Sequence, residues 1–229
     1  MTAGGIDFRW PEEGPVVYPQ SKFDRAGQVV FEDEFEDGVG KWVAFLGGAL
    51  NRVAALCDNA YPMTGAYACF MQIAAWLETA IYKYFPYVST DLSSWGIDLL
   101  LWNRSGDGAI TISFSAHDLT FNYGYYALLY AADWFYINTP AGWVPILMMR
   151  LNNATGLYYR LKLVVDLANQ RYVRFLCNDQ TIDLKSYSPT TLVGALGTQA
   201  VQVDIRLGPT VFAGESIFID SVRITQFEP

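Results

Sequence analysis

Strict alternation of apolar and polar side chains is the feature that most constrains the fold of this chain. In residues 157–165 the alternate positions hold Leu157, Tyr159, Leu161, Leu163 and Val165, with Tyr158, Arg160 and Lys162 among those between. In residues 201–207 they hold Val201, Val203, Ile205 and Leu207, separated by Gln202, Asp204 and Arg206. A period of two is that of a β-strand, whose successive side chains point to opposite faces. Both stretches therefore predict strands with one face on a core.

Turn-forming residues separate further short apolar runs along the chain. They occupy 61–65, 105–108, 152–156 and 167–170, and the predicted strands around them are 50–57, 66–73, 97–102, 109–115, 146–151, 157–166 and 172–177. Many short strands at such spacing are typical of an antiparallel β-sandwich. We expect one all-β domain over residues 30–229, with at most one short helix, for which 189–196 is the candidate region.

Residues 1–29 differ from the rest of the chain. Pro11, Pro15 and Pro19 punctuate them, and they show no periodic apolar pattern. Such a segment reads as an extended N-terminal arm. We expect Phe8, Trp10 and Tyr18 to anchor the arm on its own domain or on a neighbouring subunit.

Composition excludes several classes of protein. Of the 229 residues, 52% are hydrophobic, and the net charge of -8 disfavours nucleic-acid binding. No stretch reaches the roughly 18 apolar residues of a membrane span. The first residues have no signal-peptide pattern, which predicts assembly in the cytoplasm. The three cysteines read as buried thiols, with a Cys57–Cys69 bridge as the alternative.

Three segments in order carry a family resemblance. An acidic run, 30–38, is followed by Trp42; residues 161–184 run from an apolar strand ending at Asp166 to Asn178-Asp179; and the apolar run 217–224 is broken by Asp220. In this order they resemble the concanavalin A-like and laminin G-like lectin-type sandwiches. The resemblance covers about residues 30–226 and implies a jelly roll.

The same resemblance raises the question of catalysis. Laminarinase-type glucanases of this fold carry the triplet E-x-D-x-x-E on one mid-chain strand, which places carboxylates on one face around the scissile bond. This chain has no such triplet. We therefore expect a non-catalytic protein, and keep a glycoside-active enzyme with an unfamiliar carboxylate pair as a minor alternative. The single histidine, His117, has no nucleophile elbow near it.

Two constellations are candidate binding sites. Glu32 and Glu34 alternate on the opening strand, and with Asp220 on the closing strand they form a candidate calcium site, the alternative being a charged sheet edge. A second set is aromatic and suits sugar stacking, the alternative being a core or an interface. It consists of Tyr123, Tyr125, Tyr126, Tyr130, Trp134, Tyr136 and Trp143.

The function that these features favour is structural. An arm of this kind, a high apolar content and the missing catalytic triplet are typical of a component of a larger particle, such as a bacteriophage virion, with other subunits as partners. The alternative is a carbohydrate-binding module that uses the aromatic region 123–143.

Overall fold

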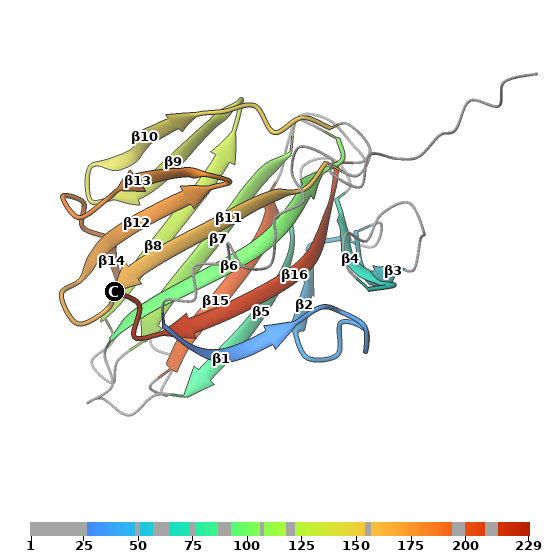
Figure 1. Cartoon of the computed structure of the whole chain (residues 1–229), viewed down its shortest axis with the longest axis horizontal. Coiled ribbons are helices and arrows are strands. Elements are labelled where there is room, and N and C mark those ends of the chain that lie inside the picture. The colour runs from blue at the N-terminus through green and yellow to red at the C-terminus, as the bar shows by residue number, and fades with distance from the viewer. Residues whose placement is uncertain are drawn as a thin grey trace, which may run out of the picture.

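The structure, a computed structural model, consists of two antiparallel β-sheets packed face to face (Figure 1). It describes residues 27–48, 51–56, 65–73, 77–86, 93–105, 108–117, 122–153, 157–193, 200–208 and 215–229. The predicted arm anchors Phe8, Trp10 and Tyr18 lie outside these ranges. The described residues contain strands and turns but no helix, and hence no helix that could cross a membrane.

Sheet A holds both ends of the described chain. Its strands follow the order β13-β12-β11-β6-β16-β4-β3, and β1 also pairs with β16. Their bounds are β1 (Gln28–Asp33), β3 (Arg52–Leu56), β4 (Ala68–Gln72), β6 (Ser94–Asn103), β11 (Tyr159–Asp166), β12 (Arg171–Cys177), β13 (Gln180–Asp183) and β16 (Ser216–Gln226). The opening strand β1 pairs with the closing strand β16, which places Glu32 opposite Arg223.

Sheet B lies behind sheet A in the view of Figure 1. Its order is β10-β9-β8-β7-β15-β5-β2, with β14 also paired to β8. Its strands are β2 (Val43–Leu46), β5 (Thr79–Pro86), β7 (Ala109–His117), β8 (Asn122–Ala131), β9 (Trp134–Thr139), β10 (Gly142–Met148), β14 (Thr190–Val193) and β15 (Ala200–Gly208). Pro145 interrupts β10, which is tolerated because β10 is an edge strand.

One helix prediction is wrong. The region expected to be helical, 189–196, contains β14, whose residues Thr190 and Leu192 pair with Tyr125 and Tyr123 of β8. The run Thr190-Thr191-Leu192-Val193 is rich in β-branched residues, which favour the pleated conformation over a helix. Pairing with an existing strand edge then decides the conformation.

The core lies between the two sheets, and the alternation predicted from sequence is confirmed there. Leu161, Leu163 and Val165 of β11 face it from sheet A, and Val203 and Ile205 of β15 face it from sheet B. Cys69 and Cys177 are buried free thiols, as predicted. Cys57, the other half of the alternative bridge, lies outside the described residues. The intervening side chains of each strand point away from the core, and they form the two outer faces of the sandwich.

Candidate functional site

The outer face of sheet B carries aromatic side chains on both sides of a polar centre. One row of paired residues crosses four strands and β14: Tyr84, Gln202, Ser115, Tyr125 and Thr190. The next row runs Val43, Tyr82, Asp204, Ser113 and Ala127. A third runs Phe45, Ala80, Arg206, Thr111, Leu129, Tyr136 and Pro145. No strand of the described residues packs on this face.

Side chains at the centre of this face are buried, and rings towards its flanks are exposed. Ser113 is 3% exposed and Ser115 is 8% exposed, whereas Tyr84 on β5 and Trp143 on β10 are each 44% exposed. The buried serines lie on β7, whereas these two exposed rings lie on β5 and β10. Neighbouring strands lie about 4.8 Å apart, so Tyr84 and Tyr125, three spacings apart, flank a strip of roughly 14 Å.

The seven aromatic residues predicted as a glycan or interface site fall into two groups. Trp134, Tyr136, Trp143 and Tyr125 alternate with core positions and point outward on β8, β9 and β10. Tyr126 and Tyr130 belong instead to the core. The side chain of Tyr123 lies outside what the structure describes.

Tyr130 has a structural role. Its hydroxyl accepts a hydrogen bond from the Leu151 backbone N–H at 3.0 Å and donates to Asp133 at 3.3 Å. Burial raises the pKa of Tyr130 to about 12, so the phenol stays protonated at neutral pH. The predicted aromatic set was therefore partly a core strand, which was its stated alternative.

A charged network lies at one end of the polar centre. Arg206 Nη2 donates to Asp204 Oδ2 at 2.9 Å, and Arg206 Nη1 contacts both carboxylate oxygens of Glu78 at 3.0 Å. Asp204 is only 5% exposed. Burial raises the pKa of its carboxyl above the ordinary value, although Arg206 lowers it. The other oxygen, Oδ1, is buried and has no hydrogen-bond donor among the described residues.

Sequence reasoning missed the β5 and β15 part of this face. It placed Gln202, Asp204 and Arg206 on the polar side of their strand but assigned them no role. Tyr82 and Tyr84 also alternate with core positions, and their rings form a T-shaped pair with centroids 5.6 Å apart. The alternation was a usable signal, but the neighbours of each strand are decided by the tertiary structure.

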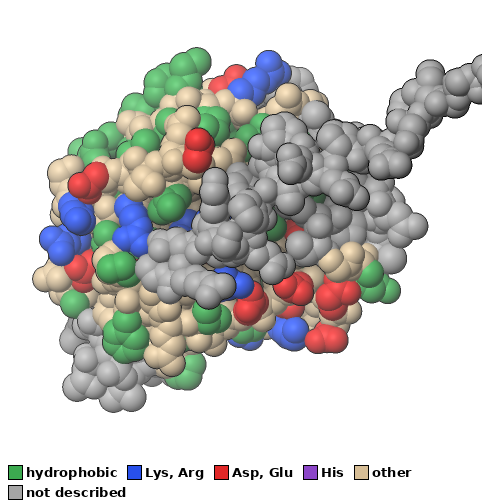
Figure 2. All heavy atoms as spheres, in the orientation of Figure 1, with side chains coloured by type: hydrophobic (Ala, Val, Ile, Leu, Met, Phe, Trp, Pro, Cys, Tyr) green, Lys and Arg blue, Asp and Glu red, His purple; other side chains and the backbone are tan. Residues whose placement is uncertain are grey.

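The predicted calcium ligands do not form one cluster. Glu32 forms an ion pair with Arg223, whose Nε lies 3.0 Å from Oε1, and Glu34 is exposed. Asp220 is fully buried. Burial of Tyr158 raises the pKa of its phenol, and the charge of Asp220 raises it further. Among the described residues no group of three or more His, Cys, Asp or Glu is placed to hold a metal ion. Figure 2 shows the acidic side chains gathered along the edge that β1 forms.

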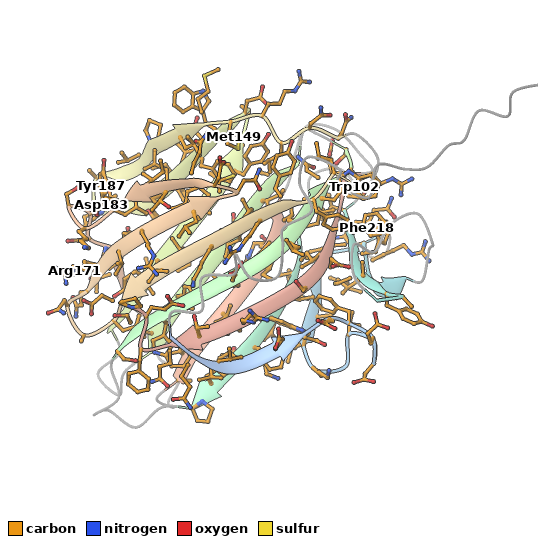
Figure 3. All side chains as sticks on the ribbon, viewed as in Figure 1. Trp102, Met149, Arg171, Asp183, Tyr187 and Phe218 are labelled. Carbon is orange, nitrogen blue, oxygen red and sulfur yellow. The ribbon has the colours of Figure 1, made fainter. Side chains whose placement is uncertain are left out.

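The outer face of sheet A is different in character. At one end lie Trp102 and Phe218, which Figure 3 labels. Their rings stack with centroids 5.1 Å apart. Towards the middle, Arg160 Nε donates to Asp98 at 3.0 Å, and Lys162 Nζ lies 2.8 Å from Glu228. These charges are paired with each other and buried, which is the arrangement expected of structural ion pairs.

Comparison with known proteins identifies the architecture. No family model matches the sequence, and no curated protein matches it. Among solved structures, the chain is similar to the cellulose-induced protein Cip1, with a TM-score of 0.54 and 10% identity over 85% of this chain and 96% of that one. It is also similar to the laminarinase from Rhodothermus marinus, with a TM-score of 0.52 and 9% identity over 87% and 97%.

The fold is a concanavalin A-like β-sandwich. A third similar structure is the globular domain of T. cruzi calreticulin, with a TM-score of 0.50 and 10% identity over 87% of this chain and 88% of that one. This confirms the fold expected from the resemblance. At such low identity the likeness concerns the fold alone, and concanavalin A-like sandwiches include both lectins and glycosidases.

Proposed function

We propose that the protein binds carbohydrate, without catalysis, along the outer face of sheet B. The observation that carries the proposal is the row Tyr84–Gln202–Ser115–Tyr125. In this row one ring lies on each side of two polar side chains. Sugars present an apolar ring face and a rim of hydroxyl groups. Aromatic side chains stack on the apolar ring face, and hydroxyl, amide and carboxylate groups form hydrogen bonds with the sugar hydroxyls.

The charges on this face support binding rather than hydrolysis. Glycoside hydrolysis uses two carboxyl groups on either side of the scissile bond, one of them free to attack or to activate water. The carboxylates of the network, Asp204 and Glu78, both bind Arg206. An arginine bound to both carboxylates neutralises part of their charge and holds them in one arrangement.

The proposal predicts that removing an exposed ring weakens glycan binding. We expect wild-type protein to be retarded in affinity gels that contain a neutral polysaccharide, with laminarin, hydroxyethyl cellulose and xylan as probes. Tyr84→Ala and Trp143→Ala should each lower the affinity roughly 5- to 10-fold, because each removes a stacking surface.

The matched control is Phe227→Ala, which removes a ring that is 57% exposed beyond the end of β16 in sheet A. Its affinity should equal that of the wild type. Equal weakening by Phe227→Ala would contradict the assignment to sheet B. Release of reducing ends from any probe by the wild-type protein would contradict the absence of catalysis.

The role in a virion or other particle stays a prediction from sequence. It depends on the N-terminal arm, and residues 1–26 lie outside the described ranges. Light scattering at high concentration tests it, because a particle component that pairs with other subunits should associate. A strictly monomeric species would count against it.

A further inference from the structure

We propose that Asp204 is a ligand-contacting residue that selects neutral glycans with free hydroxyl groups over acidic ones. This inference rests on the proposed carbohydrate binding by sheet B. It assigns to the second oxygen of Asp204, Oδ1, the role of accepting a hydrogen bond from a sugar hydroxyl.

The first support is the state of that oxygen. Asp204 Oδ2 is bonded to Arg206, while Oδ1 is buried and lacks a donor among the described residues. A buried carboxylate oxygen without a donor is costly, and such a cost is commonly retained where a ligand supplies the missing partner. Asp204 lies in the middle of the face, between Tyr82 on β5 and Ser113 on β7.

The second support is the local charge. Asp204 and Glu78 carry two negative charges, and Arg206 supplies the single positive charge that binds both. A uronate would add a further negative charge beside a buried carboxylate, which is unfavourable at low dielectric. A neutral sugar hydroxyl donates to the carboxylate without that repulsion, and a hydrogen bond to a charged acceptor is stronger than a neutral one.

Access to Oδ1 requires a side chain to move. Tyr84 is the exposed ring of this part of the face, and its hydroxyl is electrostatically coupled to Asp204. Burial raises the pKa of Tyr84, and the nearby Tyr82 and Asp204 raise it further. Exposed aromatic side chains change rotamer easily on fast timescales. In the proposal, a ligand that reaches Oδ1 displaces a neighbouring side chain of this face, of which Tyr84 is the exposed one.

The test compares neutral and acidic probes on three proteins. Wild type, Asp204→Asn and Glu78→Gln are run in affinity gels containing laminarin, hydroxyethyl cellulose or polygalacturonate. We expect the wild type to bind a neutral probe and not polygalacturonate. Asp204→Asn should lose about 10-fold or more in affinity for the neutral probe. Glu78→Gln, which removes a charge from the network but leaves Oδ1 in place, should bind that probe within a few-fold of wild type.

Thermal unfolding separates a ligand role from a structural one. Asp204→Asn removes a buried charge but retains an oxygen for Arg206, so it should melt at or above the temperature of the wild type. A lower melting temperature together with weaker binding would indicate a structural role and overturn the proposal.

The remaining outcomes are distinct. Absence of binding to every probe by the wild type would remove the proposed function itself. Binding of polygalacturonate as tightly as laminarin, or unchanged binding by Asp204→Asn, would leave carbohydrate binding in place and overturn the role of Asp204.

Discussion

At the scale of single residues, Asp33 in the acidic run 30–38 shows what one buried carboxylate does for the turn after β1. Its Oδ1 accepts the Phe35 backbone N–H at 3.1 Å, and its Oδ2 accepts the Trp42 indole N–H at 2.9 Å. Phe35 has a positive φ of 60°, an uncommon conformation for a bulky residue. Its buried ring stacks near Trp42 with centroids 6.4 Å apart. The carboxylate and the two rings together hold this turn.

Replacing Asp33 should therefore destabilise the protein. Asp33→Ala leaves two buried donors without an acceptor, and we expect a loss of about 2–4 kcal/mol in the free energy of unfolding. Urea denaturation measures it. Asp37→Ala is the control, because Asp37 is exposed and its carboxylate lies 3.2 Å from Lys41 Nζ, which also pairs with Asp33 at 3.1 Å. It should cost less than about 0.5 kcal/mol, and an equal cost for both variants would contradict the role of Asp33.

At the scale of elements, the β11–β12 hairpin shows how one side chain ends a strand. Asp166 is the last residue of β11, and its carboxylate accepts the Asn169 backbone N–H at 3.0 Å and the Asn169 side-chain amide at 2.7 Å. Arg171 Nε, at the start of β12, donates to it at 3.2 Å. Gln170 has a φ of 48°, which this tight turn requires. Burial alone would raise the pKa of Asp166, but these hydrogen bonds outweigh it and lower the pKa below 3.8.

The lowered pKa gives a pH-dependent prediction. Because the folded state holds the ionised form, the stabilisation by Asp166 is present above pH 3.8 and is lost as pH falls through the lower folded pKa. Asp166→Ala should reduce the free energy of unfolding by about 1–3 kcal/mol at pH 7. The gap to the wild type should narrow in denaturation curves below pH 4. Asp179→Ala, in the exposed next turn, should change little, and a gap independent of pH would contradict the argument.

At the scale of the whole molecule, the two sheets are joined by large side chains that cross between them. Phe175 of β12 packs against Phe135 of β9 with ring centroids 4.9 Å apart. Tyr172 of β12 reaches across to sheet B, where its hydroxyl donates to the Asn138 carbonyl at 2.7 Å and accepts the Ala127 N–H at 2.9 Å. The underside of the binding face proposed for sheet B is thus held by sheet A.

Truncation of such a residue should destabilise the whole sandwich. Phe175→Ala should cost about 3–5 kcal/mol in the free energy of unfolding, because it leaves a cavity between the sheets. Leu176→Ala is the matched control from the opposite face of the same strand, where partial exposure limits the expected cost to about 1 kcal/mol. Chemical denaturation measures both, and equal costs would show that the inter-sheet contact is not special.

In β11 and β15 the sequence by itself determined the strand and the face to which each side chain points. The period of two places Val203 in the core and Asp204 on the outer face of β15 whatever its neighbours are, because the backbone pleat fixes that geometry. It did not determine which strands are adjacent. Tyr84, Gln202, Ser115 and Tyr125 lie in one row only because β5, β15, β7 and β8 pair in that order and register. That order depends on the joint burial of both sheets, a non-local property, and so the candidate site was decided by the tertiary structure.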